Sequence, residues 1–258
     1  KAFLRFYFKG MLGLGESFIK KEWSTPELVK VIELAAQNRT FFKKNSKLAL
    51  FTSIINKIFF QSNNTKSGSK KNISYHYDLG NQFFSLWLDK TMTYSSGYFL
   101  KRNSSLEIAQ NKKYSMLTSS LSINKNDNVL EIGCGWGGLI KYVSKKIKCN
   151  TTGITISKEQ YEYTKKLIKS NSIQKHAKVK LCDYRNLSSK YDKVVSIEMF
   201  EAVGERFWNK YFKILNSILN NNGAAALQII TIDDKLYKEY SKNIDFIQKY
   251  VFPGGILP

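Results

Sequence analysis

Residues 129–138 restrict the fold more than any other stretch of the chain. Val129 to Ile132 is a short apolar run typical of a buried parallel strand, and the glycine-rich turn Gly133-Cys134-Gly135-Trp136-Gly137-Gly138 follows it directly. Leu139 to Ile147 then carries apolar residues at helical spacing. A strand, a turn with few side chains and a helix N-terminus predict a pocket at the carboxyl end of the strand, where open α/β sheets bind their ligands.

The glycines of this turn allow a ligand to lie directly against the backbone. The pattern G-C-G-W-G-G fits S-adenosylmethionine (SAM) better than a dinucleotide, and an ordinary strand-to-helix turn is the alternative that these residues alone leave open. The candidate cofactor contacts in this stretch are Glu131, Gly133, Cys134, Gly135 and Gly137.

Strands and helices continue to alternate after this turn, which predicts an α/β fold with a mostly parallel sheet and helices on both faces. Asp183 follows a predicted strand, where its carboxylate can accept the amino group of adenine, and Tyr184 lies beside it. Thr155 occupies the position where an acid would hold a ribose diol. The further strands are expected at Thr151–Ile154, Val179–Leu181, Val194–Ile197 and Ala224–Ile230.

Three sequence patterns predict where helices begin. Thr25 is the expected N-cap of a helix with Pro26 at its first position. Ser104-x-x-Glu107 and Ser157-x-x-Gln160 have the spacing of capping boxes.

Composition divides the chain at residues 61–72, a polar, small and charged stretch that predicts a linker. Before it we expect a partial N-terminal domain, residues 1–60, which is small, mainly helical, basic and rich in aromatic residues. After it, residues 73–258 form the α/β domain, in which we expect the C-terminal strands of the sheet to be missing. Three cysteines without a C-x-x-C pair indicate a reducing cytoplasm, and no run of about 18 apolar residues predicts a membrane span.

The net charge of +21 comes from 36 Lys and 5 Arg, an imbalance that with abundant Asn indicates compositional bias, so no nucleic acid is expected as partner. Residues 1–75 hold 14 Lys or Arg against 4 Glu. This density suits an anionic membrane surface, where each nearby Lys contributes about 1 kcal/mol; a solvated basic face is the alternative. No spacing typical of metal ligands is present.

Several motifs together resemble the cyclopropane-fatty-acid synthase and mycolic-acid methyltransferase family, and the resemblance covers nearly the whole chain. Two of them are dense in aromatic residues, which line a groove for an apolar ligand or form core. The motifs are Gly13–Ser17, Tyr75–Asn81, Thr93–Phe99, the glycine-rich turn, Gly153–Gln160, Asp183–Arg185, Met199–Arg206 and Phe252–Gly255.

The resemblance implies a SAM-dependent methyltransferase fold and methyl transfer to the double bond of an unsaturated phospholipid acyl chain. It also implies a bound bicarbonate as the base that closes a cyclopropane ring, held by Glu201 and the backbone of Ile230. Ser96 and Gln228 stand where the family has Cys and His, and the family's Tyr would lie beyond Pro258; these departures leave bicarbonate binding and ring closure open. The implied SAM contacts also include Tyr94, Ser95, Thr155, Ile156, Gln160, Asp183 and Tyr184.

We therefore expect a cytoplasmic enzyme that lies peripherally on the inner membrane face, with a homodimer left open. A methyl-branched instead of a cyclopropane product, a small-molecule methyltransferase and a catalytically inactive lipid-binding module are the alternatives. His76 is either catalytic or a hydrogen-bonded core residue, and Glu198 is either a supporting partner in the site or an acid at a helix N-terminus.

Overall fold

The structure is a computed structural model and describes residues 1–38, 64–77 and 79–258. The chain divides into two compact units. The smaller unit consists of residues 1–62 and 232–254, and the larger consists of residues 63–231 and 255–258. Residues 232–254, which the sequence placed with the α/β domain, thus group with the N-terminal segment.

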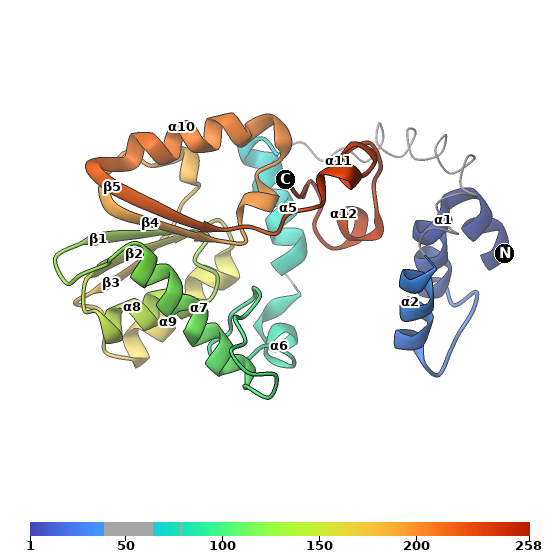
Figure 1. The fold of residues 1–258 in the computed structure, drawn as a ribbon, viewed down its shortest axis with the longest axis horizontal. Coiled ribbons are helices and arrows are strands. Elements are labelled where there is room, and N and C mark those ends of the chain that lie inside the picture. Colours follow the sequence, from blue (N-terminus) through green and yellow to red (C-terminus); the bar gives the residue numbers. More distant parts are fainter. Residues whose placement is uncertain (39–63, 78) are drawn as a thin grey trace. The chain divides into compact units, whose positions relative to one another are not determined.

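A parallel sheet of five strands forms the centre of the larger unit (Figure 1). Its strands lie in the order β3-β2-β1-β4-β5, and every neighbouring pair is parallel. The order reverses direction between β1 and β4, which is where open sheets of this type form their binding crevice. The strands are β1 (Asn128–Ile132), β2 (Asn150–Thr155), β3 (Ala177–Leu181), β4 (Tyr191–Ile197) and β5 (Leu219–Gln228).

Helices cover both faces of the sheet, so the predicted α/β class is confirmed. Helix α10 (Trp208–Ile218) lies on one face, and α7 (Leu106–Ser120), α8 (Gly138–Lys146) and α9 (Lys158–Ser170) lie on the other (Figure 1). Three short 3-10 helices follow the ends of β3 and β4: Tyr184–Asn186, Phe200–Ala202 and Glu205–Phe207.

The side chains of β1 alternate between the two layers of helices, which explains why its sequence is a continuous apolar run. Leu130 and Ile132 are buried in a cluster with Leu215 of α10. Val129 is buried in a second cluster, with Leu139 of α8 and side chains of α7. Glu131 is two residues from Val129 in the strand, so its side chain lies on the same face of the sheet and points toward α7.

All five predicted strands are present, although β5 begins before the predicted Ala224 and ends at Gln228, before the predicted Ile230. Two of the predicted helix starts are displaced. Ser157 caps α9 as expected, but the N-cap of α7 is Ser105, whose side chain accepts the backbone N–H of Ile108. The backbone N–H of Ser104 instead donates to the carbonyl of Lys101, so Ser104 belongs to a turn before the helix. Helix α2 (Leu28–Gln37) begins after Glu27, so Thr25 and Pro26 precede it instead of opening it.

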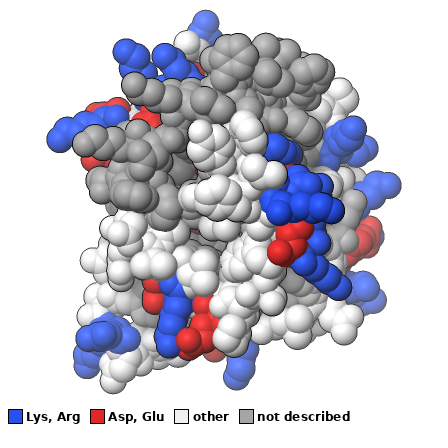
Figure 2. All heavy atoms as spheres, turned by 90° about the vertical axis from the view of Figure 1, so that its right-hand side faces the viewer, with Lys and Arg blue, Asp and Glu red and all other residues white. Residues whose placement is uncertain are grey.

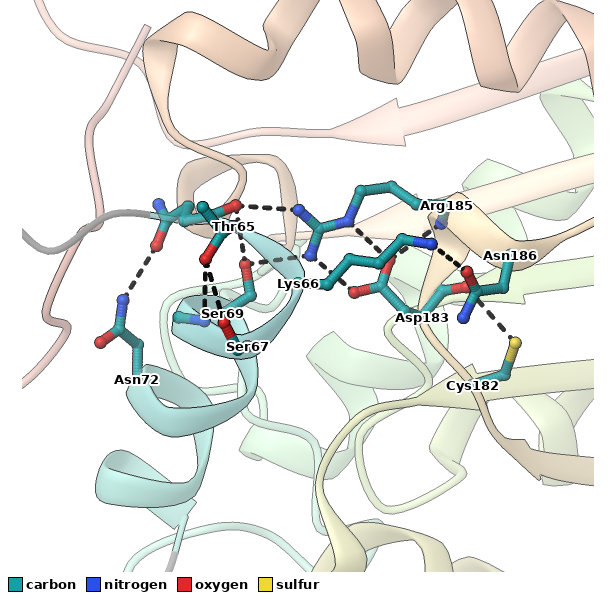
Figure 3. Close-up of polar contacts among 11 residues, drawn as sticks. Thr65, Lys66, Ser67, Ser69, Asn72, Cys182, Asp183, Arg185 and Asn186 are labelled. Atoms are coloured by element: carbon teal, nitrogen blue, oxygen red, sulfur yellow. Dashed lines mark hydrogen bonds and ion pairs between the residues drawn. The ribbon is translucent and has the colours of Figure 1, made fainter.

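Residues 66–72 of the predicted linker belong to helix α5 (Lys66–Tyr77), and the two compact units meet in sequence between residues 62 and 63; residues 61–63 lie outside the described residues. Arg185 donates hydrogen bonds to the carbonyl of Asn64 (2.8 Å) and to Oγ of Ser69 (3.2 Å), at the start of this helix (Figure 3). Tertiary hydrogen bonds thus stabilise a helix whose composition predicts a loop. The short helix α6 (Gly80–Ser85) follows.

The smaller unit is helical where it is described: α1 (Ala2–Ile19), α2, α11 (Asp234–Tyr240) and α12 (Phe246–Tyr250). Glu16 of α1 is buried and accepts hydrogen bonds from Lys9 (2.8 Å), Lys249 (2.6 Å) and Tyr250 (3.0 Å). Burial alone would raise the pKa of Glu16, but these hydrogen bonds outweigh it and lower the pKa to about 2. Among the described helices none is long and apolar enough to cross a membrane.

The contact between β2 and the glycine-rich turn leaves no room for a side chain at Gly153. A Cβ atom there would lie 2.3 Å from Cδ1 of Ile140 and 2.8 Å from Cβ of Cys134. We expect Gly153→Ala to lower the free energy of unfolding by about 1–3 kcal/mol through overpacking, seen as a drop of about 2–10 °C in the melting midpoint. Lys178→Ala, at an exposed position of β3, is the control; equal midpoints for both variants would contradict the packing.

Candidate functional site

The glycine-rich turn after β1 presents an open backbone surface. Gly133, Gly135 and Gly137 have φ angles of 79°, 52° and 84°, a region that favours glycine. A Cβ atom on Gly135 would meet nothing within 4 Å, whereas one on Gly133 would lie 2.6 Å from Cγ of Met199. The turn thus packs against the protein at Gly133 and is open at Gly135, as a cradle for a ligand would be.

Cys134, predicted as a cofactor contact, turns its side chain into the core. It is buried with Ile140 and Ile168, and burial raises the pKa of its thiol well above the usual value. Its backbone N–H, like that of Gly133, donates to the carbonyl of Ile154 (3.0 Å). Any contact of Cys134 with a ligand would therefore involve its carbonyl or α-carbon.

Glu131 is a buried carboxylate with an unused acceptor. Its Oε2 atom has no hydrogen-bond partner within the described part of the chain. Burial raises the pKa of Glu131 well above its usual value, and the charge of Lys113 partly opposes this. A polar ligand that brings a hydrogen-bond donor to Oε2 would relieve the desolvation cost.

Lys113 of α7 is a site residue that the sequence did not reveal. It is 3% exposed, and its Nζ donates to Oγ of Ser95 (2.5 Å). Burial lowers its pKa to about 8, although the charges of Glu198 and Glu131 act in the opposite direction. The buried face of α7 also carries Gln110 and Thr118, so no apolar stripe marked Lys113 as an inward-facing residue.

Thr155 and Gln160, both predicted cofactor contacts, bind each other at the end of β2. Oγ1 of Thr155 donates to Oε1 of Gln160 (2.7 Å) and accepts the N–H of Ser157 (3.1 Å). Both side chains are buried, and Ile156 between them is half-buried. The side chains at the end of β2 are therefore polar and uncharged, and their mutual hydrogen bond holds them in place.

Asp183 lies at the end of β3 as predicted, but Arg185 holds its carboxylate (Figure 3). Nε and Nη2 of Arg185 donate to its two oxygens at 2.8 and 2.6 Å. Burial alone would raise the pKa of Asp183, and the bonds from Arg185 outweigh it and lower the pKa. Tyr184 packs its ring 5.2 Å from that of Tyr211, edge to face. The sequence motif that contains Arg185 gave no sign of this pairing.

Ser96 and Gln228, distant in sequence, meet at the carboxylate of Glu198. Oε1 of Glu198 accepts three hydrogen bonds: from the N–H of Ser96 (2.9 Å), from its Oγ (2.7 Å) and from Nε2 of Gln228 (2.8 Å). Nε2 of Gln228 also donates to Oγ of Ser96 (3.0 Å). The two side chains that the resemblance assigned to bicarbonate are thus bound to a carboxylate of the protein itself.

Glu201 lies beside this cluster, and the structure brings it together with Ile230 as expected. The N–H of Ile230 donates to Oε1 of Glu201. Oε2 is buried and has no hydrogen-bond partner among the residues that the structure describes. Burial raises the pKa of Glu201, the bond from Ile230 opposes this, and the nearby charge of Glu198 adds to the rise.

Aromatic side chains lie beside the glycine-rich turn, and several of them form core, one of the two roles that the sequence left open. Phe84 and Trp136 are buried with Met92, and Tyr94 packs against this cluster. The ring of Tyr94 stacks on that of His76 at 5.5 Å, so the structure places His76 in this packed cluster. Trp87 is 47% exposed.

The residues at this edge of the sheet fit SAM. The open cradle at Gly135, the unused acceptor of Glu131 and the aromatic rings offer contacts for a ligand with amino groups and a flat base. Across residues 1–38, 64–77 and 79–258, no group of three or more His, Cys, Asp or Glu side chains is arranged to hold a metal ion.

Residues 64–258 match the family described as Mycolic acid cyclopropane synthetase. The chain is 34% identical over 258 residues to the Tuberculostearic acid methyltransferase UfaA1 of Mycobacterium tuberculosis, with 96% of this chain and 60% of that protein covered. It is also 34% identical over 268 residues to the Cyclopropane-fatty-acyl-phospholipid synthase of Escherichia coli K12, with 99% and 64% covered. The chain thus spans less than two thirds of the length of these relatives.

The fold of this chain is also similar to that of a solved structure. The mycolic acid cyclopropane synthase CmaA1 complexed with SAH and CTAB superposes with a TM-score of 0.68 at 29% identity, over 73% of this chain and 70% of that one. The family match, residues 64–258, contains the site described above. The chain belongs to the mycolic acid cyclopropane synthetase family, a family of SAM-dependent methyltransferases.

Proposed function

We propose that this chain carries the catalytic site of an enzyme that transfers a methyl or methylene group from SAM to the double bond of an unsaturated phospholipid acyl chain. The observation that carries this proposal is the position of two carboxylates, Glu198 and Glu201, at the carboxyl end of β4. This end adjoins the glycine-rich turn after β1, because β1 and β4 are neighbours in the sheet. Methylation of an alkene leaves a positive charge on the lipid, which fixed carboxylates stabilise.

SAM supplies an electrophilic methyl group when bound. The chain's own residues would hold it with the open backbone at Gly135, the acceptor of Glu131 and the polar edge of Thr155 and Gln160. Asp183 and Tyr184 remain the proposed contacts of its adenine. The remaining proposed contacts are Tyr94, Ser95, Gly133, Cys134, Gly137 and Ile156.

The aromatic cluster supports an apolar acceptor. Because an alkene is a poor nucleophile, it must be aligned with the methyl group in a dry environment. Phe84 and Trp136 are almost fully buried next to Tyr94, so this side of the site excludes water. The same surroundings keep water from reaching a cation on the lipid.

A methyl-branched product is the second candidate. Ser96 and Gln228 replace the two residues that the resemblance assigned to a bicarbonate base, and both bind Glu198 instead. A relative at 34% identity is a tuberculostearic acid methyltransferase, and another at the same identity is a cyclopropane synthase. The cyclopropane and the methyl-branched product require the same methyl transfer, and they differ in how the methylated lipid then loses its proton.

The smaller unit supports a lipid surface as the place of the reaction. Phe3, Leu4 and Tyr7 of α1 are 57–74% exposed. Lys1, Arg5 and Lys9 alternate with them in the sequence; Lys1 is exposed, and Arg5 and Lys9 are half-buried and pair with Glu22 and Glu16. Exposed apolar side chains among basic ones are typical of helices that lie on anionic membranes. Lys and Arg are spread over the face drawn in Figure 2, and Asp and Glu are fewer there. Peripheral binding to the inner membrane face is part of the proposal.

The proposed reaction is tested with the whole protein, SAM and vesicles of mono-unsaturated phospholipid. We expect the acyl chains to gain one methylene unit by mass spectrometry. Resistance of the product to ozone would identify a cyclopropane, and cleavage by ozone would identify a methylated product that keeps a double bond. No gain in mass, together with SAM turnover on a soluble amine, would contradict the proposal and support a small-molecule methyltransferase.

Cofactor binding is tested separately at Gly135. We expect Gly135→Ala to weaken the binding of SAH, measured by calorimetry, at least about tenfold, or about 1.4 kcal/mol. The reason is that the new methyl group enters the open space over the cradle. Gly10→Ala is the matched control, because Gly10 also has a positive φ and open space but lies in the smaller unit. Equal SAH affinities for the two variants would place the ligand elsewhere.

A further inference from the structure

One carboxylate oxygen of Glu198 accepts hydrogen bonds from three donor groups of Ser96 and Gln228; these three residues form a polar cluster. The N–H and Oγ of Ser96 and Nε2 of Gln228 all bind Oε1, at 2.7–2.9 Å. Three short bonds to one oxygen fix the position and the rotamer of the side chain. Oε2 has no hydrogen-bond partner in the part of the chain that the structure describes and is free to accept a proton.

The backbone at Glu198 is in an unusual conformation. Its φ is 46°, in the left-handed region that non-glycine residues seldom adopt. Its N–H donates to the carbonyl of Gln228 (2.8 Å), which holds the end of β4 against β5. A residue kept in a strained conformation by its surroundings is frequently part of a functional site.

The other groups of the cluster are poorer bases. Ser96 and Gln228 carry no group that accepts a proton near neutral pH. Glu201 has one oxygen bound to the N–H of Ile230, and its second oxygen is buried.

We propose that Glu198 is the base of the reaction: its Oε2 accepts the proton that the methylated lipid must lose. This inference rests on the proposed methyl transfer. For a ring, the proton leaves the transferred methyl group, and the electrons of that C–H bond form the bond from the methyl carbon to the cationic carbon. For a new double bond, the proton leaves a carbon bonded directly to the cationic carbon, and the electrons of that C–H bond form the second bond between the two. Glu198 becomes a neutral carboxylic acid and returns the proton to solvent.

This role makes an external anion unnecessary. The donors of Ser96 and Gln228 are already bound to Glu198, so a bicarbonate ion would have to displace a covalently attached carboxylate and approach its negative charge. The chain thus carries its base as a side chain in the place where the resemblance implied a bound ion.

Two substitutions separate the basic role of Glu198 from a structural one. Glu198→Gln keeps an oxygen that can accept the three hydrogen bonds but removes the base; we expect turnover on phospholipid vesicles to fall about 100-fold or more, with SAH affinity and melting midpoint unchanged. Glu198→Gly removes the carboxylate and suits the positive φ, so we expect an equal loss of turnover with an unchanged or higher midpoint. Added formate should restore part of the turnover of Glu198→Gly.

Lys148→Gly is the matched control, because Lys148 also has a positive φ (63°) and lies after α8, outside the site; its turnover should equal that of the wild type. Turnover of Glu198→Gln within about threefold of the wild type would overturn the proposal. A Glu198→Gly variant that formate does not restore would also overturn it, in favour of a structural role. An inactive wild type that binds SAH would contradict the proposed function instead.

Discussion

The hydrogen bonds to Oε1 of Glu198 join three segments that are far apart in the sequence. Ser96 precedes α7, Glu198 follows β4, and Gln228 ends β5. Because the strand order reverses between β1 and β4, these segments converge beside the glycine-rich turn. The topology thus brings the carboxylates close to the cofactor cradle, and the bonds to Glu198 determine their geometry.

The other ionisable side chains of the site are buried, and their hydrogen bonds do not fully compensate the cost of removing them from water. Glu131 and Glu201 each have one oxygen without a hydrogen bond in the described part of the chain, and burial raises the pKa of both. Lys113 is buried near Glu131 and Glu198, and burial lowers its pKa. Such groups cost stability in the free protein, and they are arranged to interact with ligands that bring amino groups or positive charge.

The sequence predicted the sheet and the cofactor turn, because apolar runs and glycines follow local rules, and the resemblance to the family implied that Glu201 and the backbone of Ile230 meet. The sequence missed what depends on long-range contacts. The stretch that became α5 has a loop composition, and Arg185 stabilises it from more than 100 residues away. Lys113 lies on a buried helix face without an apolar pattern. The convergence of three donors on Glu198 depends on strand order, which no local pattern encodes.

The most direct test of this account is a crystal structure of the whole protein with SAH bound. We predict that SAH lies against Gly135 with its sulfur toward the space between Glu198 and Glu201, and that Ser96 and Gln228 still bind Glu198. A sulfur atom that faces away from both carboxylates, or a Glu198 side chain displaced by a bound anion, would contradict the account.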